Sequence, residues 1–128
     1  MQSPIRITFH NMEPSSVMEA DVRQRADKLD RIYDRIVSCR VVIEAPHRRH
    51  HKGKLYAVKI DISVPGKEIV VNSNGVNDHG HEDAYIAIRH AFDAAARQLE
   101  AHAAKQRGQV KNHAAPGGAI PAKGEEEP

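Results

Sequence analysis

The sequence predicts an α+β protein, a two-layer β-α-β-β-β-α sandwich in which a four-stranded mixed sheet carries two helices on one face. Three observations lead to this fold class. Three short runs alternate apolar with polar residues, which is typical of strands that bury one face, and a fourth apolar run follows the last of them across a turn. Two longer runs repeat apolar residues every three or four positions, which is typical of amphipathic helices. The 128 residues leave room for one domain of this kind.

The first strand and the first helix are expected near the N-terminal end. Residues 5–9 alternate apolar and polar side chains, so they predict a strand. Two serines followed by Glu19 predict a helix that begins near residue 17, with the hydroxyl of Ser16 capping its free backbone N–H groups. The residues of this helix that share a core-facing spacing are Met18, Val22, Ala26, Leu29, Ile32 and Tyr33.

Three further strands are predicted at residues 37–43, 56–64 and 68–73, and Pro65 and Gly66 separate the last two as a turn. A strand–helix–strand start implies a right-handed crossover and a parallel first pair, whereas the short later connections imply antiparallel pairing. Since each strand has one apolar face, both helices should cover the same side of the sheet.

The last helix is predicted over residues 83–107, and its apolar face consists of Ala84, Ile88, Ala91, Phe92, Ala95 and Leu99. Residues 108–128 are rich in Ala, Pro, Gly and Glu and contain too few apolar groups to offset the entropy of ordering. We therefore expect a domain at residues 1–107 and a disordered tail or linker at residues 108–128.

The cysteine content and the hydropathy of the chain indicate a cytoplasmic protein. Cys39, the single cysteine, lies in a strand pattern, so we expect a buried thiol in a reducing compartment. No apolar run reaches the roughly 18 residues that a membrane helix needs. We expect no membrane contact.

The formal net charge of +2 is too small to indicate a nucleic-acid partner by itself, so the positions of the charges decide. The most basic segment is the loop at residues 46–54, which has no acidic residue and contains Arg48, Arg49, Lys52 and Lys54 beside three histidines. It is either an arm that neutralises phosphates or a solvated loop, and we favour the first interpretation.

Both predicted helices carry side chains that should face outward and bear positive charge. They are Lys28, Arg31 and Arg35 toward the end of the first helix, and Arg89, His90, Arg97, His102, Lys105 and Arg107 on the last. If the helices lie side by side, these groups form a moderately positive surface. The tyrosines at positions 33, 56 and 85 lie on or beside core faces, so we expect them to be buried. Buried tyrosines cannot stack on bases, so the protein would then recognise the backbone and the shape of folded RNA.

Metal binding and catalysis are the rival interpretations of the polar residues. The histidines at 47, 50 and 51, and those at 79 and 81 beside acidic residues, lack the spacing of a known metal motif. Asp27 and Asp30 have the spacing of ordinary ion pairs on a helix surface. The sequence has no nucleophile elbow and no phosphate-binding glycine loop. We therefore expect no enzyme activity, no metal, no cofactor and no small-molecule substrate.

Two segments carry a family resemblance. Residues 28–36, with the sequence KLDRIYDRI, and residues 83–99, which begin DAYIAI and end RQL, resemble the hibernation-promoting factor and ribosome-associated inhibitor A family, the sigma-54 modulation proteins, in its short form. The resemblance covers about residues 3–107. It implies a domain that lies between the head and the body of the small ribosomal subunit, in the path of mRNA and tRNA, and blocks translation in stressed cells.

The resemblance also implies the site and the partner, which is the RNA of the small ribosomal subunit. Lys28, Arg31 and Arg35 match the basic end of the family's first helix, and Arg97 matches the arginine of its last. Alanine at 94 and histidine at 102 stand where the family usually carries lysine, which thins the positive surface. The complete set of expected RNA-binding residues is Lys28, Arg31, Arg35, Arg48, Arg49, Lys52, Lys54, Arg89, Arg97 and Lys105.

Two alternatives stay open. Long members of the family carry a C-terminal module that pairs ribosomes, and we expect nothing after Gly108 to fold into one. A full-length chain should then act on single ribosomes, and a fragment would use its tail as a linker to the missing module. The other alternative is an RNA-binding domain of a larger stress-regulatory protein whose main ligand is not the ribosome.

Overall fold

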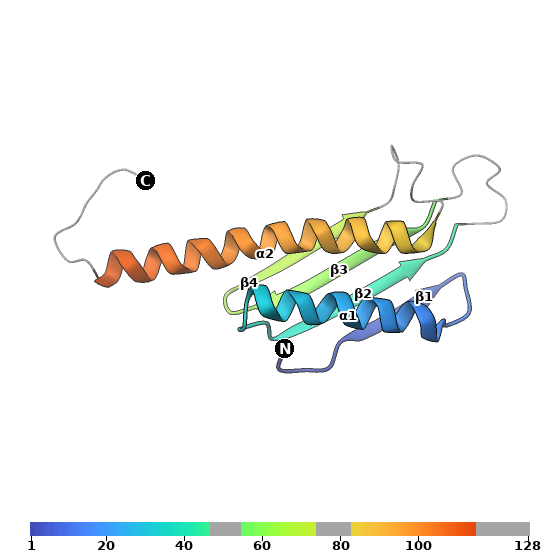
Figure 1. Cartoon of the computed structure of the whole chain (residues 1–128), viewed down its shortest axis with the longest axis horizontal. Coiled ribbons are helices and arrows are strands. Elements are labelled where there is room, and N and C mark those ends of the chain that lie inside the picture. Colours follow the sequence, from blue (N-terminus) through green and yellow to red (C-terminus); the bar gives the residue numbers. More distant parts are fainter. Residues whose placement is uncertain (47–54, 74–82, 115–128) are drawn as a thin grey trace.

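The elements follow each other in the predicted order. The computed structural model describes residues 1–46, 55–73 and 83–114. The helices and strands are β1 (Arg6–His10), α1 (Ser16–Ile32), β2 (Ser38–Glu44), β3 (Ala57–Val64), β4 (Lys67–Ser73) and α2 (Ala84–Ala114) (Figure 1). This arrangement confirms the predicted α+β sandwich.

The four strands form one sheet in the order β1-β2-β3-β4. β1 runs parallel to β2, and the other two pairs are antiparallel, as the connections predict. The register aligns Ile7, Val41, Ile60 and Val71 in one row across all four strands. Because residues two apart on a strand share a face, rows of this kind make one side of the sheet apolar.

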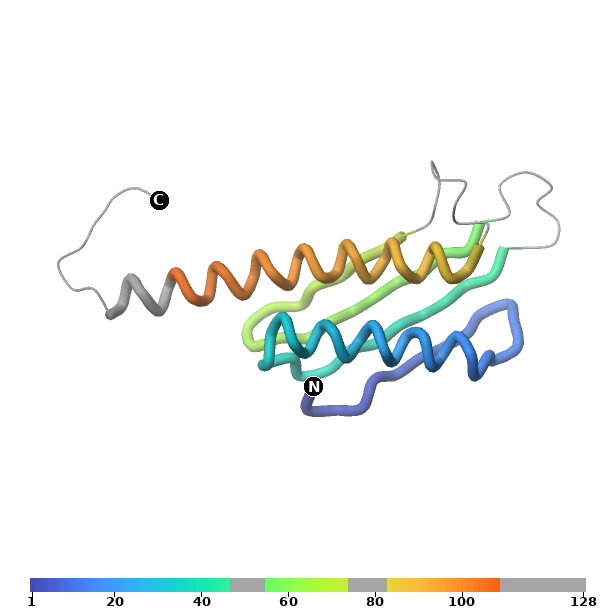
Figure 2. The backbone as a smooth tube through the Cα atoms, in the orientation of Figure 1, coloured from blue at the N-terminus to red at the C-terminus, as the bar shows by residue number. Residues whose placement is uncertain are grey.

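Both helices lie on this apolar side and run in the same direction, with α1 over β1 and β2 and α2 over β3 and β4 (Figure 1, Figure 2). α2 is the longer helix and continues past the end of α1. In the described part of the chain, no element covers the opposite side of the sheet. The molecule therefore has a helical face and an open sheet face.

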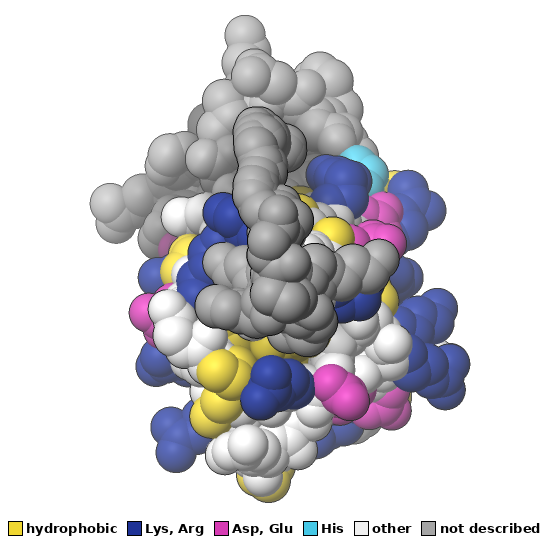
Figure 3. Space-filling view, turned by 90° about the vertical axis from the view of Figure 1, so that its left-hand side faces the viewer, with side chains coloured by type: hydrophobic (Ala, Val, Ile, Leu, Met, Phe, Trp, Pro, Cys, Tyr) yellow, Lys and Arg dark blue, Asp and Glu magenta, His cyan; other side chains and the backbone are white. Residues whose placement is uncertain are grey.

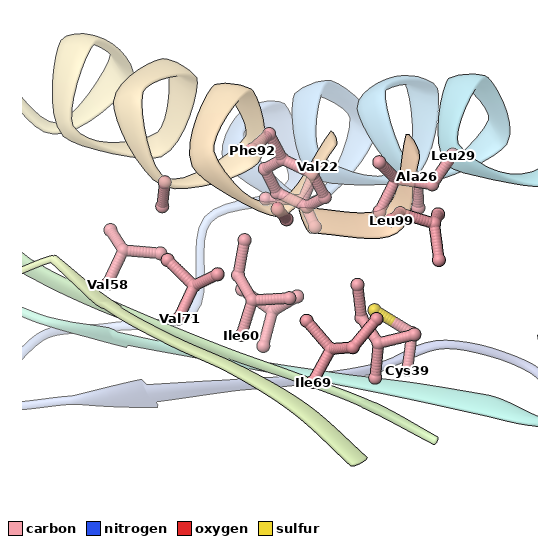
Figure 4. Close-up of a cluster of buried hydrophobic side chains, with 14 of the residues drawn as sticks. Val22, Ala26, Leu29, Cys39, Val58, Ile60, Ile69, Val71, Phe92 and Leu99 are labelled. Atoms are coloured by element: carbon pink, nitrogen blue, oxygen red, sulfur yellow. The ribbon is translucent and has the colours of Figure 1, made fainter. Parts of the chain in front are cut away.

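The core lies between the helices and the sheet (Figure 4). Val22, Ala26 and Leu29 of α1 and Leu99 of α2 point toward the sheet and are buried. Cys39 is buried on the sheet side of the same cluster, as predicted. Burial, with a smaller effect of nearby carboxylates, raises the pKa of the Cys39 thiol to about 12. A thiol with this pKa stays protonated at neutral pH and is not a nucleophile.

Pro65 and Gly66 form the turn between β3 and β4, as predicted. Gly66 has a φ of 75°, which glycine adopts without steric strain. Proline before such a glycine is the combination that a type II turn favours, because the proline ring fixes its own φ near −65°. The turn sets the register in which Val64 lies opposite Lys67.

α1 begins one residue earlier than predicted because Ser15, and not Ser16, is its N-cap. The Ser15 hydroxyl accepts a hydrogen bond from the backbone N–H of Met18 at 3.2 Å, and the Ser15 carbonyl accepts one from Glu19 at 2.9 Å. Ser15 has extended backbone angles, whereas Ser16 is already helical. Two adjacent serines fit the same sequence pattern, and these backbone angles decide which of them is the cap.

Replacing Ser15 by alanine is expected to lower the free energy of unfolding by about 1 kcal/mol, because the N–H of Met18 loses its acceptor. Urea denaturation measures this change. Ser16→Ala is the matched control, and no loss is expected there, since Ser16 is inside the helix and alanine favours helices. A larger loss from Ser16→Ala than from Ser15→Ala would contradict the assignment of the cap.

α2 begins at Ala84, one residue after its predicted start, because Asp83 is its cap. The Asp83 carboxylate accepts a hydrogen bond from the N–H of Tyr85 at 2.8 Å, and the Asp83 carbonyl accepts one from Ala87 at 3.1 Å. The predicted helix end at residue 107 is wrong, because the helix continues to Ala114. Glycine inside a helix costs only about 1 kcal/mol relative to alanine, so Gly108 does not stop it. Residues 115–128 lie outside the described residues, and the division into domain and tail stays a prediction.

The three tyrosines differ in burial. Tyr33 is buried and Tyr56 is half-buried, but Tyr85 is 39% exposed, so the prediction that it joins the core is wrong. The reason is the rotation of α2. Ala84 and Ile88 point inward from its first turns and place Tyr85 beside the buried face.

Candidate nucleic-acid interface

The predicted cations at the end of α1 lie on the outer side of the helical face. Leu29 is buried, and Arg31, two residues or about 200° further round the helix, points nearly the opposite way. Lys28 is exposed on the same helix, and Arg35 is exposed in the segment that follows it. All three side chains are accessible to a ligand.

The predicted cations of α2 are also exposed, but they do not share one side of the helix. Arg89, Arg97 and Lys105 are spaced by eight residues. Each step turns about 80° round the helix axis, so Arg89 and Lys105 point about 160° apart. Arg107 follows Arg89 by 18 residues, which is five turns of about 3.6 residues, and therefore shares the side of Arg89.

Acidic residues interrupt the side of α2 that carries Arg89 and Arg107. Asp93 follows Arg89 by four residues, and Glu100 precedes Arg107 by seven, so both lie along the same stripe. Both carboxylates are exposed. The positive charge of α2 is therefore spread round the helix and does not form one continuous band. Arg89 and Arg107 share one side, Arg97 lies about 80° from it and Lys105 about 160° from it.

Ion pairing separates the predicted cations from three other arginines. Arg23, Arg25 and Arg40 each lie close to a carboxylate, at distances of 3.8, 3.1 and 3.8 Å between the charged groups. Within the described residues, none of the six predicted cations of the helical face forms an ion pair. These six residues are Lys28, Arg31, Arg35, Arg89, Arg97 and Lys105. Their charges are available to an anionic partner without the loss of an internal contact.

The open sheet face carries charges of both signs and is a poorer candidate for binding phosphates. Arg40 of β2 pairs with Asp61 of β3, its neighbour across the two strands. The Asp61 carboxylate also raises the pKa of Glu68, by hydrogen bonding and by its charge. Because the one arginine here lies beside two carboxyl groups, the helical face is the better candidate interface for phosphates.

The basic loop falls on residues 47–54, outside the described residues. The predicted roles of Arg48, Arg49, Lys52 and Lys54 therefore stay predictions, as does the absence of a metal site at the histidines of residues 47–51 and 79–81. Among the residues that the structure describes, no group of three His, Cys, Asp or Glu side chains is placed to hold a metal ion.

The described helices include none with the length and hydropathy needed to cross a membrane.

His102 is buried, so the prediction that it faces outward is wrong. Its side chain is on the core side of α2, and only 6% of the residue is exposed. The imidazole ring meets the Tyr33 ring edge to face, with the ring centroids 5.3 Å apart and an angle of 80° between the planes. Its Nε2 atom is buried without a hydrogen-bond partner in the described residues. Burial, followed by the charges of Lys67 and Lys105, lowers the pKa of His102.

The lowered pKa of His102 predicts a loss of stability in mild acid. The imidazole of His102 binds a proton more readily in the unfolded chain than in the folded one. Neutral His102 therefore makes its full contribution to the free energy of unfolding above pH about 6.5, and this contribution is lost as the pH falls toward the folded-state pKa. His102→Phe should remove this part of the pH dependence, which one proton limits to about 1.4 kcal/mol per pH unit. Urea denaturation between pH 7 and pH 5, at about half-unit steps, measures it.

His10→Gln is the matched control for this prediction, because His10 is exposed on β1 and the variant leaves His102 in place. Its stability should fall with pH as steeply as that of the wild type. Parallel curves for the wild type and His102→Phe would mean that His102 does not contribute.

A cleft of about 630 Å³ opens where α2 passes the end of α1. Arg31 lines it from the last turn of α1, Arg35 from the segment that follows α1, and Arg107 from α2. Figure 3 views the molecule from this end, and Lys and Arg side chains lie along both flanks of that view. Arg107 was predicted to belong to the positive surface of the last helix but not to the RNA-binding residues, although its spacing of five turns from Arg89 indicates that the two share a side.

Comparisons with known proteins agree with this fold. A model of the family described as sigma 54 modulation protein / S30EA ribosomal protein matches residues 5–107. The ribosome hibernation promoting factor of Azotobacter vinelandii is 28% identical to this chain over 102 residues, which are 80% of this chain and 84% of that protein.

Two solved structures have a similar fold. The N-terminal domain of Thermus thermophilus Protein Y has a TM-score of 0.59 at 20% identity, and the match covers 76% of this chain and 94% of that one. A ribosomal subunit interface protein from Coxiella burnetii has a TM-score of 0.60 at 17% identity, with 78% and 97% of the two chains covered. At these identities the two structures show the shared fold.

Proposed function

The chain belongs to the sigma 54 modulation protein / S30EA ribosomal protein family, and from this membership we propose that it associates with ribosomes and keeps them inactive. A relative that it resembles over most of both lengths is named a ribosome hibernation promoting factor. A protein of similar fold is named a ribosomal subunit interface protein. These names point to the same class of activity.

The proposed partner is the RNA of the small ribosomal subunit, in the channel where mRNA and tRNA bind. The observation that carries this proposal is the set of cations on the helical face that form no ion pair with any described residue, Lys28, Arg31, Arg35, Arg89, Arg97 and Lys105. Cations that have no internal carboxylate partner can bind phosphate oxygens directly. Contacts to phosphates fix the position of a protein on RNA without reading its sequence.

The proposed mechanism requires binding and no chemistry. A body built on one packed core keeps its shape when bound. Placed in the channel, it would exclude mRNA and tRNA by occupying their space. No bond is made or broken, so no cofactor and no small-molecule substrate take part. We expect this activity in the cytoplasm of stressed cells.

Co-sedimentation with purified small ribosomal subunits tests the proposal. The wild-type chain should sediment with the subunits at low salt and be released as salt rises, because the cations of the salt compete for the phosphates. The logarithm of the association constant should fall with the logarithm of the salt concentration, by about 0.7–0.9 per phosphate contacted. Purified large subunits are the control and should bind more weakly.

Competition identifies the channel. Small subunits preloaded with mRNA and tRNA should bind less of the chain than empty subunits. Strong binding to free structured RNA with none to subunits would instead favour the alternative function, an RNA-binding domain whose main ligand is not the ribosome.

A further inference from the structure

The cleft at the end of α1 has a positively charged rim. Arg31, Arg35 and Arg107 line it, against one acidic residue, Asp34. The three arginines are exposed and form no ion pair within the described residues. Because they come from two different elements, an anion in the cleft can be approached by guanidinium groups from both sides.

The inner wall of the cleft is apolar and held in place. Tyr33 and Ala103 line the cleft and are buried, and Ile32 beside them is half-buried. The backbone N–H of Tyr33 donates the last helical hydrogen bond of α1 to the Leu29 carbonyl at 3.1 Å, and the extended backbone of Tyr33 ends the helix. The Tyr33 ring also packs against His102 of α2. These contacts fix the wall before any ligand enters.

The positively charged rim and the apolar wall of the cleft together favour one class of ligand. Inorganic phosphate would use the arginines alone, and an apolar molecule would use the wall alone. A nucleotide uses both, because its phosphate binds arginine and its base packs on apolar surfaces and on guanidinium planes. The volume of about 630 Å³ lies within the range of about 300–1,000 Å³ that is usual for small-ligand sites.

We propose that this cleft binds one unstacked nucleotide of a single-stranded segment of RNA. Its base lies against the half-buried Ile32 and the parts of Tyr33 and Ala103 that face the cleft, and its phosphate contacts Arg31, Arg35 and Arg107. The nucleotide belongs to a single-stranded segment because bases within a duplex are stacked and cannot enter a cleft. The proposal rests on the proposed ribosomal function and adds one contact that depends on a base, beside contacts that depend on phosphates.

Two short RNA probes separate the base from the phosphates. One is a fluorescent tetraadenylate, and the other is an abasic tetramer with the same phosphates. Fluorescence anisotropy at one salt concentration should show that the full chain binds the tetraadenylate about tenfold more tightly, as expected for one stacked base. Equal affinity for the two probes would overturn the proposal, because binding would then be purely electrostatic.

Gln106 lines the cleft from α2 and offers a way to fill it without a change of charge. Gln106→Trp should abolish the difference between the two probes. Gln98→Trp is the matched control, since Gln98 is an exposed residue of the same helix that does not line the cleft, and it should keep the difference. Retention of the difference in Gln106→Trp would overturn the proposal.

A measurement on the wild-type chain does not depend on how the variants fold. NMR signals of the Ala103 methyl group and the Tyr33 ring should shift with tetraadenylate and stay in place with the abasic tetramer. Unchanged signals with both probes would overturn the proposal. Tighter binding of free adenosine monophosphate than of tetraadenylate would also overturn it, because the site would then serve a free nucleotide.

The ribosomal function is tested separately. If the wild type sediments with small subunits but does not distinguish the two probes, only the cleft proposal fails. If the wild type does not bind subunits at all, the proposed function fails whatever the probes show.

Discussion

A double variant with Arg31→Glu and Arg97→Glu is expected to bind small ribosomal subunits at least about 100-fold more weakly than the wild type. The two arginines are exposed, belong to different helices and have no carboxylate partner within the described residues. A hydrogen bond to a charged group is worth about 1.5–3 kcal/mol, and about 1.4 kcal/mol corresponds to a factor of ten in affinity. Two lost contacts therefore exceed 100-fold, and the repulsion of glutamate by phosphate adds to the effect.

The salt dependence gives a second measure of the same variant. Its binding should depend less steeply on salt, because about two fewer counterions are displaced from the RNA. Co-sedimentation at several salt concentrations provides both the affinity and this slope. Circular dichroism of the variant shows whether the fold is retained.

A control variant separates the position of the charges from their number. Arg6→Glu with Lys59→Glu changes the net charge by the same amount on the open sheet face, where both residues are exposed. It should bind subunits within a few-fold of the wild type. If the two double variants lose affinity equally, net charge and not the helical face governs binding, and the proposed interface is wrong.

Replacing Leu99 by alanine is expected to lower the free energy of unfolding by about 3 kcal/mol. Leu99 is fully buried in the cluster that joins both helices to the sheet (Figure 4). Its truncation removes apolar contacts and leaves a cavity that a packed core fills only in part. Since domains of this size have total stabilities of about 5–15 kcal/mol, the melting temperature should fall by roughly 10–20 °C.

Val17→Ala is the matched control, because Val17 lies on α1 with 65% of its surface exposed. Its effect should stay within about 0.5 kcal/mol of zero. Thermal and urea denaturation measure both variants. A loss of less than about 1 kcal/mol in Leu99→Ala would contradict the packing of α2 on the sheet.

Much of the fold was predictable because it depends on patterns over a few residues. The alternation in residues 56–64 identifies β3 and its buried face, and the spacing of Val22, Ala26 and Leu29 identifies the buried side of α1. The parallel pair of β1 and β2 follows from the helix between them. None of these inferences needs information from distant residues.

The errors arose where the outcome depends on more than the local pattern. His102 was interpreted as exposed because it is polar, although it follows Leu99 by three residues and so continues the core-facing repeat. Its burial depends on the ring of Tyr33, which is distant in sequence. The end of α2 was placed at a glycine that the helix tolerates.

The candidate interface was predictable in its members but not in its arrangement. The exposure of Arg31, Arg97 and Lys105 follows from their positions between buried residues. How they group depends on the rotation of each helix about its axis and on which side of α2 faces α1. Arg107 joins Arg31 at the cleft only because α2 passes the end of α1.

The burial of Cys39 makes its thiol a natural probe of how often the core opens. An alkylating reagent cannot reach the thiol of a residue that is only 2% exposed, and the protonated thiol does not react. Modification therefore requires a fluctuation that separates the helices from the sheet. Because this is the single cysteine of the chain, the rate of its labelling, with and without bound subunits, would report how strongly a partner suppresses such openings.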